Sequence, residues 1–458
     1  MAPPTSRPPR PRGLLRAALG GFLLAMATTG GVVYVLGVDV PIHDQWPYAE
    51  DLVRHLSTAP TVRELAQPVN EHRLLFPRAL MLLLARMTDW NIRAELLAAF
   101  LVAVVAVVAL LLAVRPLIRR QPLILLAVGA LYFSLHAWQN WLWSWQIQIW
   151  LNVLGATMAV VALAGPTVRR LRFVVAAAGF VFAAYSFAAG LALGPVGLLL
   201  LGRRSGGRSR ASLFGWAGLT AAIAVHYAAG YSRPEGHPAM ATSFSPGALL
   251  FGLVCLGAPV SLSSVGGMWL AASLGTLGLL SALLLVLASR AVRTSRVGRV
   301  AIGILLYGAL ACALTAFGRS GFGVQLAYQS RYGTYAALFW IGLVFLGGLT
   351  CPSPLGCRRW WVRGGICAVA LLATVRSVES WPAVVAYARE TRQARDFLLD
   401  RERQAVVEAP TPSGRRIVKR LAREVRVLQT TPDQLERALP LLRGRGLSLY
   451  RRSGRPPG

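Results

Sequence analysis

Long runs of apolar residues alternate with short polar segments over most of this chain. A helix needs roughly 20 consecutive apolar residues to cross a hydrocarbon core that is ~30 Å thick. Residues 14–37, 94–114 and 302–317 are clear examples. Because the core of a bilayer holds no water to satisfy peptide groups, such runs must be helical. The pattern predicts an all-α, polytopic transmembrane helical bundle of about eleven spans. The expected spans are residues 14–37, 94–114, 122–136, 151–163, 173–187, 191–201, 211–229, 268–287, 301–317, 335–349 and 365–378.

One further apolar segment, residues 246–264, fits two topologies. If it crosses the membrane, the basic stretch 290–299 lies on the outer side. If it enters and returns, that stretch lies in the cytoplasm. Arginine is enriched in cytoplasmic loops, which favours the second topology. Re-entrant backbone is tolerated only where protein or a wet cavity covers it, so this segment is a candidate lining of a site.

The charge of the chain follows the same alternation. Its formal net charge is +30, although only 14% of its residues are charged and 55% are hydrophobic. The arginines cluster in alternate short segments between the apolar runs, as the positive-inside rule requires. We therefore interpret the positive charge as a signature of topology and expect no nucleic-acid partner. The rule places the N-terminus in the cytoplasm, before an uncleaved first span.

Two longer polar segments stand apart from the apolar runs. Residues 39–73 form the first extracytoplasmic loop and are unusually acidic. Two short helices, at 47–56 and 74–87, are expected to lie on the membrane surface there. A small polar tail, 381–458, follows the transmembrane domain, 1–380. In the tail, which is expected outside, helices are predicted at 384–409, 414–427 and 432–442.

The side chains that can carry acid–base chemistry are confined to one face. No Asp or Glu falls in a segment that we place in the cytoplasm. Any general acid or base should therefore act on the extracytoplasmic side. A cluster of tryptophans follows the third expected span, and we interpret it as an interfacial belt. Its members are Trp138, Trp141, Trp143, Trp145 and Trp150.

The first loop holds the best candidate for a general base. Asp44 lies a few residues beyond the first span, at the membrane surface, in a loop crowded with other polar side chains. A carboxylate beside a medium of low dielectric constant is easily tuned toward general-base catalysis. An isolated loop carboxylate is more often simply solvated. The sequence Glu71-His72-Arg73 at the far end of the loop favours the functional reading.

Arg331 and Tyr332 are the second candidate pair, just before a late span. An interfacial arginine and a belt tyrosine would explain them equally well. As a site, they would bind an anion, since a guanidinium forms bidentate hydrogen bonds with phosphate. Arg73 is another candidate for this role.

Three stretches resemble the GT-C glycosyltransferases, which are polytopic enzymes that use lipid-phosphate sugars. More closely, the chain resembles uncharacterised bacterial membrane proteins related to the protein mannosyltransferase and arabinosyltransferase-like branch. The likeness runs through most of the chain. The matching stretches are His43-Asp44-Gln45-Trp46, Asn70-Glu71-His72-Arg73 and Ser330-Arg331-Tyr332.

The resemblance implies a site and a reaction. In that fold a first-loop aspartate, flanked by two membrane-surface helices, is catalytic, which here is Asp44. A sugar would pass with inversion from a polyprenyl-phosphate donor to an extracytoplasmic glycan, lipid or protein, in the bacterial cytoplasmic membrane. The residues implied in substrate binding are Glu71, His72, Arg73, Arg331 and Tyr332.

One feature departs from the pattern and leaves the need for a metal open. Relatives often have two adjacent acids in the first loop, whereas here Gln45 follows Asp44. A divalent ion usually takes more than one carboxylate. Asp44, Glu71 and His72 are the candidate ligands if a divalent metal takes part.

Two other classes of function stay open at this point. The chain would also suit a transporter or flippase of lipid-linked saccharides, or a non-catalytic membrane scaffold that presents the basic tail. Transporters often contain inverted repeats and charges within their spans. The sequence has no clear internal repeat and few charges inside the apolar runs, which favours an enzyme.

Overall fold

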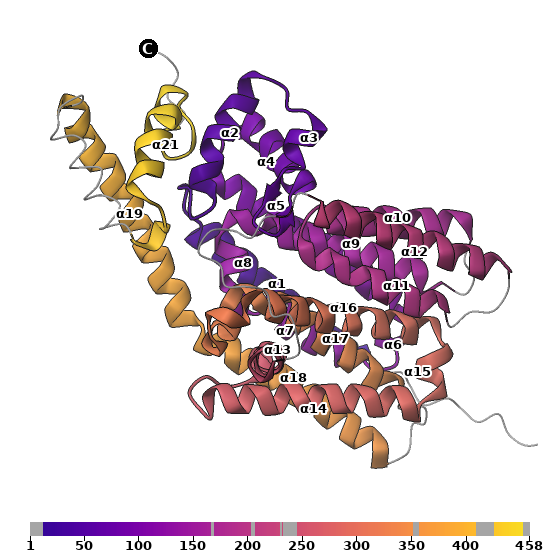
Figure 1. Ribbon diagram of the computed structural model, residues 1–458. Helices are drawn as coiled ribbons and strands as arrows, with labels where there is room; N and C mark the ends of the chain where they lie inside the picture. Colours follow the sequence, from indigo (N-terminus) through magenta and orange to yellow (C-terminus); the bar gives the residue numbers. More distant parts are fainter. Residues whose placement is uncertain are drawn as a thin grey trace, which may run out of the picture.

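The protein is almost entirely helical (Figure 1). The computed structural model describes residues 12–165, 169–202, 207–229, 231, 245–350, 357–408 and 426–451. Within these residues the one sheet is a two-stranded antiparallel ladder, β1 (Pro68–Val69) with β2 (His72–Arg73). The prediction of an all-α fold is confirmed.

The α-helices are α1 (Arg12–Leu36), α2 (Gln45–Ser57), α3 (Val62–Leu65), α4 (Leu75–Thr88), α5 (Ile92–Ala113), α6 (Arg115–Ile118), α7 (Ile124–Tyr132), α8 (Trp138–Leu142), α9 (Ile147–Leu163), α10 (Arg170–Ala184), α11 (Leu193–Gly202), α12 (Gly207–Ala228), α13 (Pro246–Gly257), α14 (Gly267–Ala288), α15 (Arg290–Thr294), α16 (Arg296–Arg319), α17 (Gly333–Leu349), α18 (Cys357–Glu379), α19 (Trp381–Glu408) and α21 (Pro432–Gly444). Short 3-10 turns are η1 (Leu135–Ala137), η2 (Ser144–Gln146), η3 (Ala188–Ala192), η4 (Ala258–Val260), η5 (Ser320–Phe322), η6 (Val324–Tyr328), η7 (Ser330–Tyr332), η8 (Arg426–Leu428) and η9 (Ser448–Tyr450).

Eight helical stretches among the described residues are long and apolar enough to cross a membrane. Each coincides with one of the eleven expected spans. The other three expected spans are shorter helices, because α7 has 9 residues, α10 has 15 and α11 has 10. The 3-10 turn η1 follows α7, and the 3-10 turn η3 directly precedes α11, so neither helix continues further in that direction. The chain is therefore a multi-pass membrane protein with eight candidate spans.

The ambiguous segment 246–264 does not form a full-length span. It contains α13, of 12 residues, followed by η4 and a turn into α14. Gly252 of α13 lies against Ala316, three residues from the end of α16, and Gly257 crosses Ala271 near the start of α14. Since these helix ends lie on the same side of the bundle, α13 stays near that side. The structure thus agrees with the topology that the charge pattern favours.

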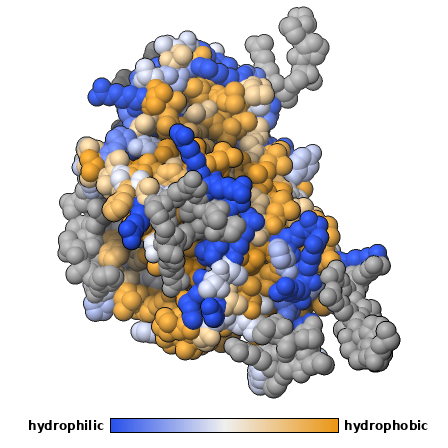
Figure 2. All heavy atoms as spheres, turned by 90° about the vertical axis from the view of Figure 1, so that its right-hand side faces the viewer, coloured by the Kyte–Doolittle hydropathy of each residue, from blue (hydrophilic) through white to orange (hydrophobic). Residues whose placement is uncertain are grey.

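The two ends of the bundle differ in charge. At one end, which we call the arginine end, α6 and α15 connect long helices on the right of Figure 1. The connecting segments 114–124, 164–172 and 288–300 contain no Asp or Glu. Figure 2 faces this end and shows hydrophilic patches between hydrophobic ones. The exposed arginines of these three segments are Arg115, Arg119, Arg120, Arg169, Arg170, Arg290 and Arg296.

The opposite end, which we call the loop end, joins the first loop to the C-terminal residues. Both helices expected in the loop are present, as α2 and α4. Only Ser380 separates α18 from α19, and α21 lies beside α2 (Figure 1). The helices expected at 384–409 and 432–442 correspond to α19 and α21, whereas 414–427 lies almost wholly outside the described residues.

The tryptophan cluster is not a lipid-facing belt, and that interpretation is wrong. Trp141, Trp143, Trp145 and Trp150 are all buried inside the protein. Trp141 stacks on Trp150, with ring centroids 4.1 Å apart. The sequence signal was misleading because aromatic residues near span ends serve equally well as internal packing between helices. Trp143 and Trp145 instead line the cavity described next.

Candidate active site

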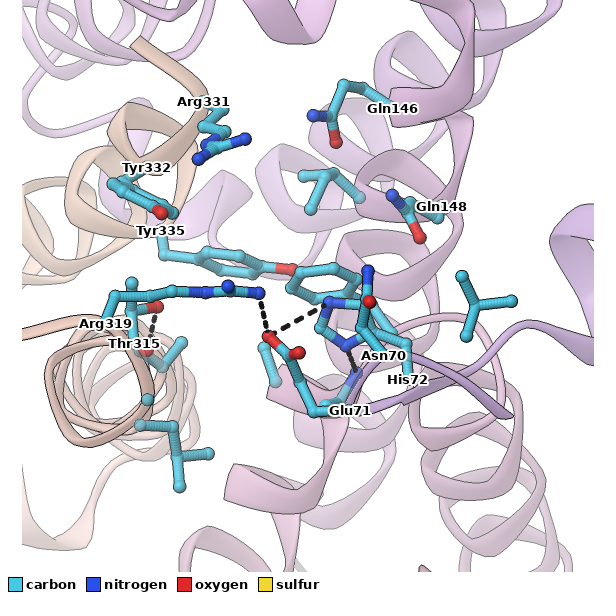
Figure 3. A pocket seen from close by; sticks show the side chains of 18 of the residues that line it. Asn70, Glu71, His72, Gln146, Gln148, Thr315, Arg319, Arg331, Tyr332 and Tyr335 are labelled. Atoms are coloured by element: carbon cyan, nitrogen blue, oxygen red, sulfur yellow. Dashed lines mark hydrogen bonds and ion pairs between the residues drawn. The ribbon is translucent and has the colours of Figure 1, made fainter. Parts of the chain in front are cut away.

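A cavity of about 640 Å³ lies at the loop end, between the two halves of the chain. Figure 3 shows polar side chains reaching into it from both halves. Five of the six predicted site residues line it, namely Asp44, Glu71, His72, Arg331 and Tyr332. The first half also contributes Asn70, Gln146 and Gln148, and the second half contributes Thr315, Arg319 and Tyr335.

Asp44 lies at the start of α2, and its carboxylate forms no hydrogen bond with the helix. It is the N-cap residue, yet its side chain accepts no hydrogen bond from the helix. Its Oδ1 lies 3.2 Å from Nδ1 of His43, and 29% of the Asp44 side chain is exposed. His43 in turn stacks on Trp143, with ring centroids 5.0 Å apart. A carboxylate in this state can accept a proton from a molecule in the cavity.

Gln45, which stands where relatives often have a second acid, has a structural role. Its side chain is fully buried and donates hydrogen bonds to Glu95 (3.3 Å) and Ser144 (2.7 Å). Ser144 and the Trp90 indole also donate to the Glu95 carboxylate, at 2.7 and 3.0 Å. This network fixes the backbone beside Asp44 to α5 and to the turn that carries Trp143. The acid that shares the cavity with Asp44 is Glu71.

Glu71 forms an ion pair across the cavity with Arg319, at the end of α16. His72 Nε2 lies 3.6 Å from the same carboxylate oxygen, and the Ala188 N–H donates to His72 Nδ1 at 3.4 Å. The proton of the neutral ring therefore sits on Nε2, toward Glu71. Burial lowers the pKa of His72 to about 4, more than the neighbouring Glu71 carboxylate raises it. His72 is thus a neutral donor at pH 7.

Arg331 is held by its backbone and leaves its guanidinium to the cavity. Asn140 donates to the Arg331 carbonyl at 2.9 Å, and Gln139 accepts from its N–H at 3.3 Å. The guanidinium lies over the Tyr332 ring, 5.3 Å from its centroid. Among the described residues no carboxylate pairs with it. In Figure 3 it points into the cavity, toward Gln146.

Arg73 does not line the cavity, which corrects its assignment to substrate binding. Its guanidinium donates to the carbonyls of His226 (2.7 Å) and Ala229 (2.6 Å), at the end of α12. It also lies 5.8 Å from the centroid of the Tyr227 ring. In the β1–β2 ladder, neighbouring side chains point to opposite faces, so Arg73 points away when His72 points in. The Arg73 guanidinium thus caps the end of α12.

The candidate metal ligands do not assemble into a metal site. Asp44, Glu71 and His72 share the cavity, but in the described part of the chain no three His, Cys, Asp or Glu side chains come together as ligands. Glu71 is instead engaged by Arg319. We therefore derive no step that passes through a metal.

Sequence reasoning missed Arg319, Gln146 and Gln148. Arg319 ends an apolar span, where an arginine has no distinctive pattern. The two glutamines lie within the tryptophan cluster, between Trp145 and Trp150, and are 4% exposed, which marks them as buried polar groups only once the fold is known. Their spacing of two residues within a segment rich in tryptophan was the one signal available.

Comparison with known proteins identifies no relative, because no protein-family model, no curated protein and no solved structure matches the chain. A functional assignment has to come from the cavity itself.

Proposed function

We propose that the protein is a membrane glycosyltransferase of GT-C type, which moves a sugar from a polyprenyl-phosphate donor to an extracytoplasmic acceptor with inversion. One observation carries the proposal. The Asp44 carboxylate and the Arg331 guanidinium, 287 residues apart in sequence, line the same cavity at one end of an apolar helical bundle. A base and an anion-binding cation in one site are the two groups that transfer from a sugar phosphate needs.

In the proposed reaction Asp44 accepts the proton of an acceptor hydroxyl. The hydroxyl oxygen bonds to the anomeric carbon as the bond from that carbon to the phosphate oxygen breaks. Attack from the face opposite the phosphate inverts the anomeric centre. The polyprenyl phosphate leaves with the electron pair, and Arg331 donates hydrogen bonds to the negative charge that develops on it.

The surroundings of the cavity suit such a donor. Its polyprenyl chain would stay in the bilayer while the sugar phosphate enters the loop end of the bundle. Aromatic walls, which include Trp143, Trp145 and Phe187, suit the apolar face of a sugar ring. We place the loop end on the extracytoplasmic side of the bacterial cytoplasmic membrane, since the arginine end fits the positive-inside rule.

The test is Asp44→Asn, assayed in proteoliposomes with a panel of polyprenyl-phosphate sugars. The variant keeps the size of the side chain but loses its basicity, so turnover should fall about 100- to 10,000-fold. Arg331→Lys should also slow transfer, because an ammonium cannot form the planar bidentate contact with phosphate. Expression and thermal stability should change little in Asp44→Asn, since its carboxylate is partly exposed.

Glu64→Gln is the matched control, because it neutralises a carboxylate of the same loop that does not line the cavity. Glu64 caps α3 through Thr61, so a small loss of stability with unchanged turnover is expected. Near-normal turnover of Asp44→Asn would refute the assignment of the base. Absence of transfer from every donor, together with movement of lipid-linked saccharide across the bilayer, would instead identify a transporter.

A further inference from the structure

The last described segment of the chain, residues 426–451, lies across the first loop. We call this segment the C-terminal brace. It begins with η8, continues through α21 and ends at η9. The brace contacts the first loop near its beginning, next to Asp44, along α2 and at its end. Sequence reasoning treated it as part of a separate polar tail.

The brace packs on α2 through an apolar face. Leu435, Ala438, Leu439 and Leu442 of α21 are buried at a spacing of three and four residues. Such a spacing is typical of one helix face packed against a partner. On α2, Glu50 pairs with Arg437 of the brace at 3.0 Å. Further along, Arg445 donates to Ser57 at 2.5 Å, so the contact follows the length of α2.

The two ends of the brace are hydrogen-bonded to the backbone of the first loop just before α2 and to the backbone just after α4. The His43 N–H donates to the Leu428 carbonyl at 2.8 Å, one residue before Asp44. At the other end, the Ser448 N–H donates to the Asp89 carbonyl at 3.0 Å. Arg451 approaches the Asp39 carboxylate, which is mostly buried, to 3.4 Å.

Backbone strain is concentrated along this contact. Six non-glycine residues of the described chain have positive φ angles. Five of them lie where the first loop meets the brace, and the sixth, Asn70, lines the cavity. Such a conformation persists only where surrounding contacts enforce it. The five at the contact are His43 (φ 56°), Asp89 (52°), Trp90 (51°), Gln429 (47°) and Ser448 (51°).

We infer that the C-terminal brace is a positioning element, which holds His43 in its left-handed conformation and thereby aims the Asp44 carboxylate into the cavity. Its effect on turnover rests on the proposed function of Asp44. The hydrogen bond from His43 to Leu428 and the packing of α21 on α2 together set where α2 begins. A displacement of the base by about 1 Å lowers turnover roughly 100-fold. A substitution that detaches the brace should therefore disable the site although no residue that lines the cavity is replaced.

The test detaches α21 with Leu439→Asp, which places a carboxylate in the buried face. Leu441→Asp is the matched control, because Leu441 lies in the same helix and is 38% exposed. Val53→Cys reports on docking, since Val53 is buried and lies between Glu50 and Ser57 on the face of α2 that meets the brace. Asp44→Cys reports on the site itself. Each variant is made in full-length protein without the native cysteines and labelled with a maleimide.

In Leu439→Asp, labelling of Cys at position 53 should become at least tenfold faster, and labelling at position 44 should change at least threefold. With Asp44 present, kcat should fall about 100-fold while KM for the donor changes less. Leu441→Asp should alter none of these, and Leu439→Met should behave like the wild type. Where Leu439→Asp does not accumulate, Leu439→Ala replaces it, with the same direction of effect.

Faster labelling at position 53 with unchanged labelling at position 44 would overturn the inference, because the brace would then merely cover α2. Unchanged labelling at both positions would overturn it as well. A wild type that transfers no sugar refutes the proposed function alone, since the two labelling rates still decide whether the brace positions residue 44.

Discussion

At the scale of single residues, burial and pairing set the charges around the cavity. His72 is neutral because burial penalises its charged form, and Glu71 and Arg319 neutralise each other. Asp44 has a histidine beside it, and Arg331 is left without a carboxylate partner among the described residues. The cavity is therefore lined by one negative group from the first half of the chain and one positive group from the second half, which suits a substrate that carries both a hydroxyl and an anion.

The buried His72 ring predicts a pH dependence of stability. Its pKa is about 4 in the folded protein, whereas an unfolded histidine has a pKa near 6.5. As the pH falls below about 6.5, the histidine of the unfolded chain binds a proton, whereas His72 of the folded protein stays neutral until the pH nears 4. The free energy of unfolding therefore decreases between pH 6.5 and 4. Above pH 6.5 the ring contributes no pH dependence.

Thermal unfolding in detergent at pH 7.5, 6.5, 5.5 and 4.5 measures this effect. The wild type should lose more stability between pH 6.5 and 4.5 than His72→Gln, which has no ring to protonate. The groups that face His72 are Glu71, Asp44, Arg319 and Arg331, and all four are present in both proteins. Parallel curves for the two proteins would contradict the assignment of a neutral buried ring.

At the scale of elements, the short helix α13 supports the cavity from behind, since none of its residues lines the cavity. The tight crossing of α13 and α14 is possible because glycines lie at the contact, so that the two backbones touch. α13 also packs on η6, which precedes the cavity residues of η7, and on α16, which carries cavity residues itself. A segment too short to cross the membrane thus supports the second half of the site.

Gly257→Ala should separate α13 from α14. A Cβ atom at Gly257 would lie 1.8 Å from the Ala271 carbonyl oxygen, so one backbone has to move. Overpacking of this kind costs about 1–3 kcal/mol. The control is Gly247→Ala in the same helix, where a Cβ atom meets nothing within 4 Å. Thermal unfolding of the purified proteins should show a lower midpoint for Gly257→Ala alone, and equal midpoints would argue against the close crossing.

At the scale of the whole molecule, the two ends of the apolar bundle differ in charge. The first loop, the cavity and the C-terminal brace share the loop end, and the arginine end has no acidic residue in its connecting segments. Because the brace touches the first loop, both must lie on the same side of the membrane. Sequence reasoning placed both outside from the count of spans, despite the basic character of the tail.

Labelling of intact cells checks this arrangement. In a background without the native cysteines, Ser57→Cys and Glu436→Cys should react with an impermeant thiol reagent in intact cells. Thr294→Cys, in the connection between α14 and α16, should react only after lysis. All three positions are exposed in the folded protein. The reverse pattern would place the cavity in the cytoplasm and exclude an extracytoplasmic acceptor.

Hydropathy alone determined the helical class, the eight long candidate spans and the two helices of the first loop, because a bilayer admits little other than helices. Three further predicted spans are shorter helices in the structure, since apolar composition does not reveal where a helix changes to a 3-10 turn. For the site, chemical type and membrane side, together with the resemblance to GT-C glycosyltransferases, selected Asp44, Glu71, His72 and Arg331, which share the cavity.

Only the tertiary structure decided which side chains face the cavity and which support it. Arg73 and His72 are neighbours in sequence, yet one caps α12 and the other lines the cavity, because adjacent residues of an extended strand point in opposite directions. Arg319, Trp143 and Trp145 line the cavity because segments that are distant in the sequence pack together there. The contact between Leu428 and His43 spans 385 residues, and no local pattern encodes a hydrogen bond between two backbone groups so far apart along the chain.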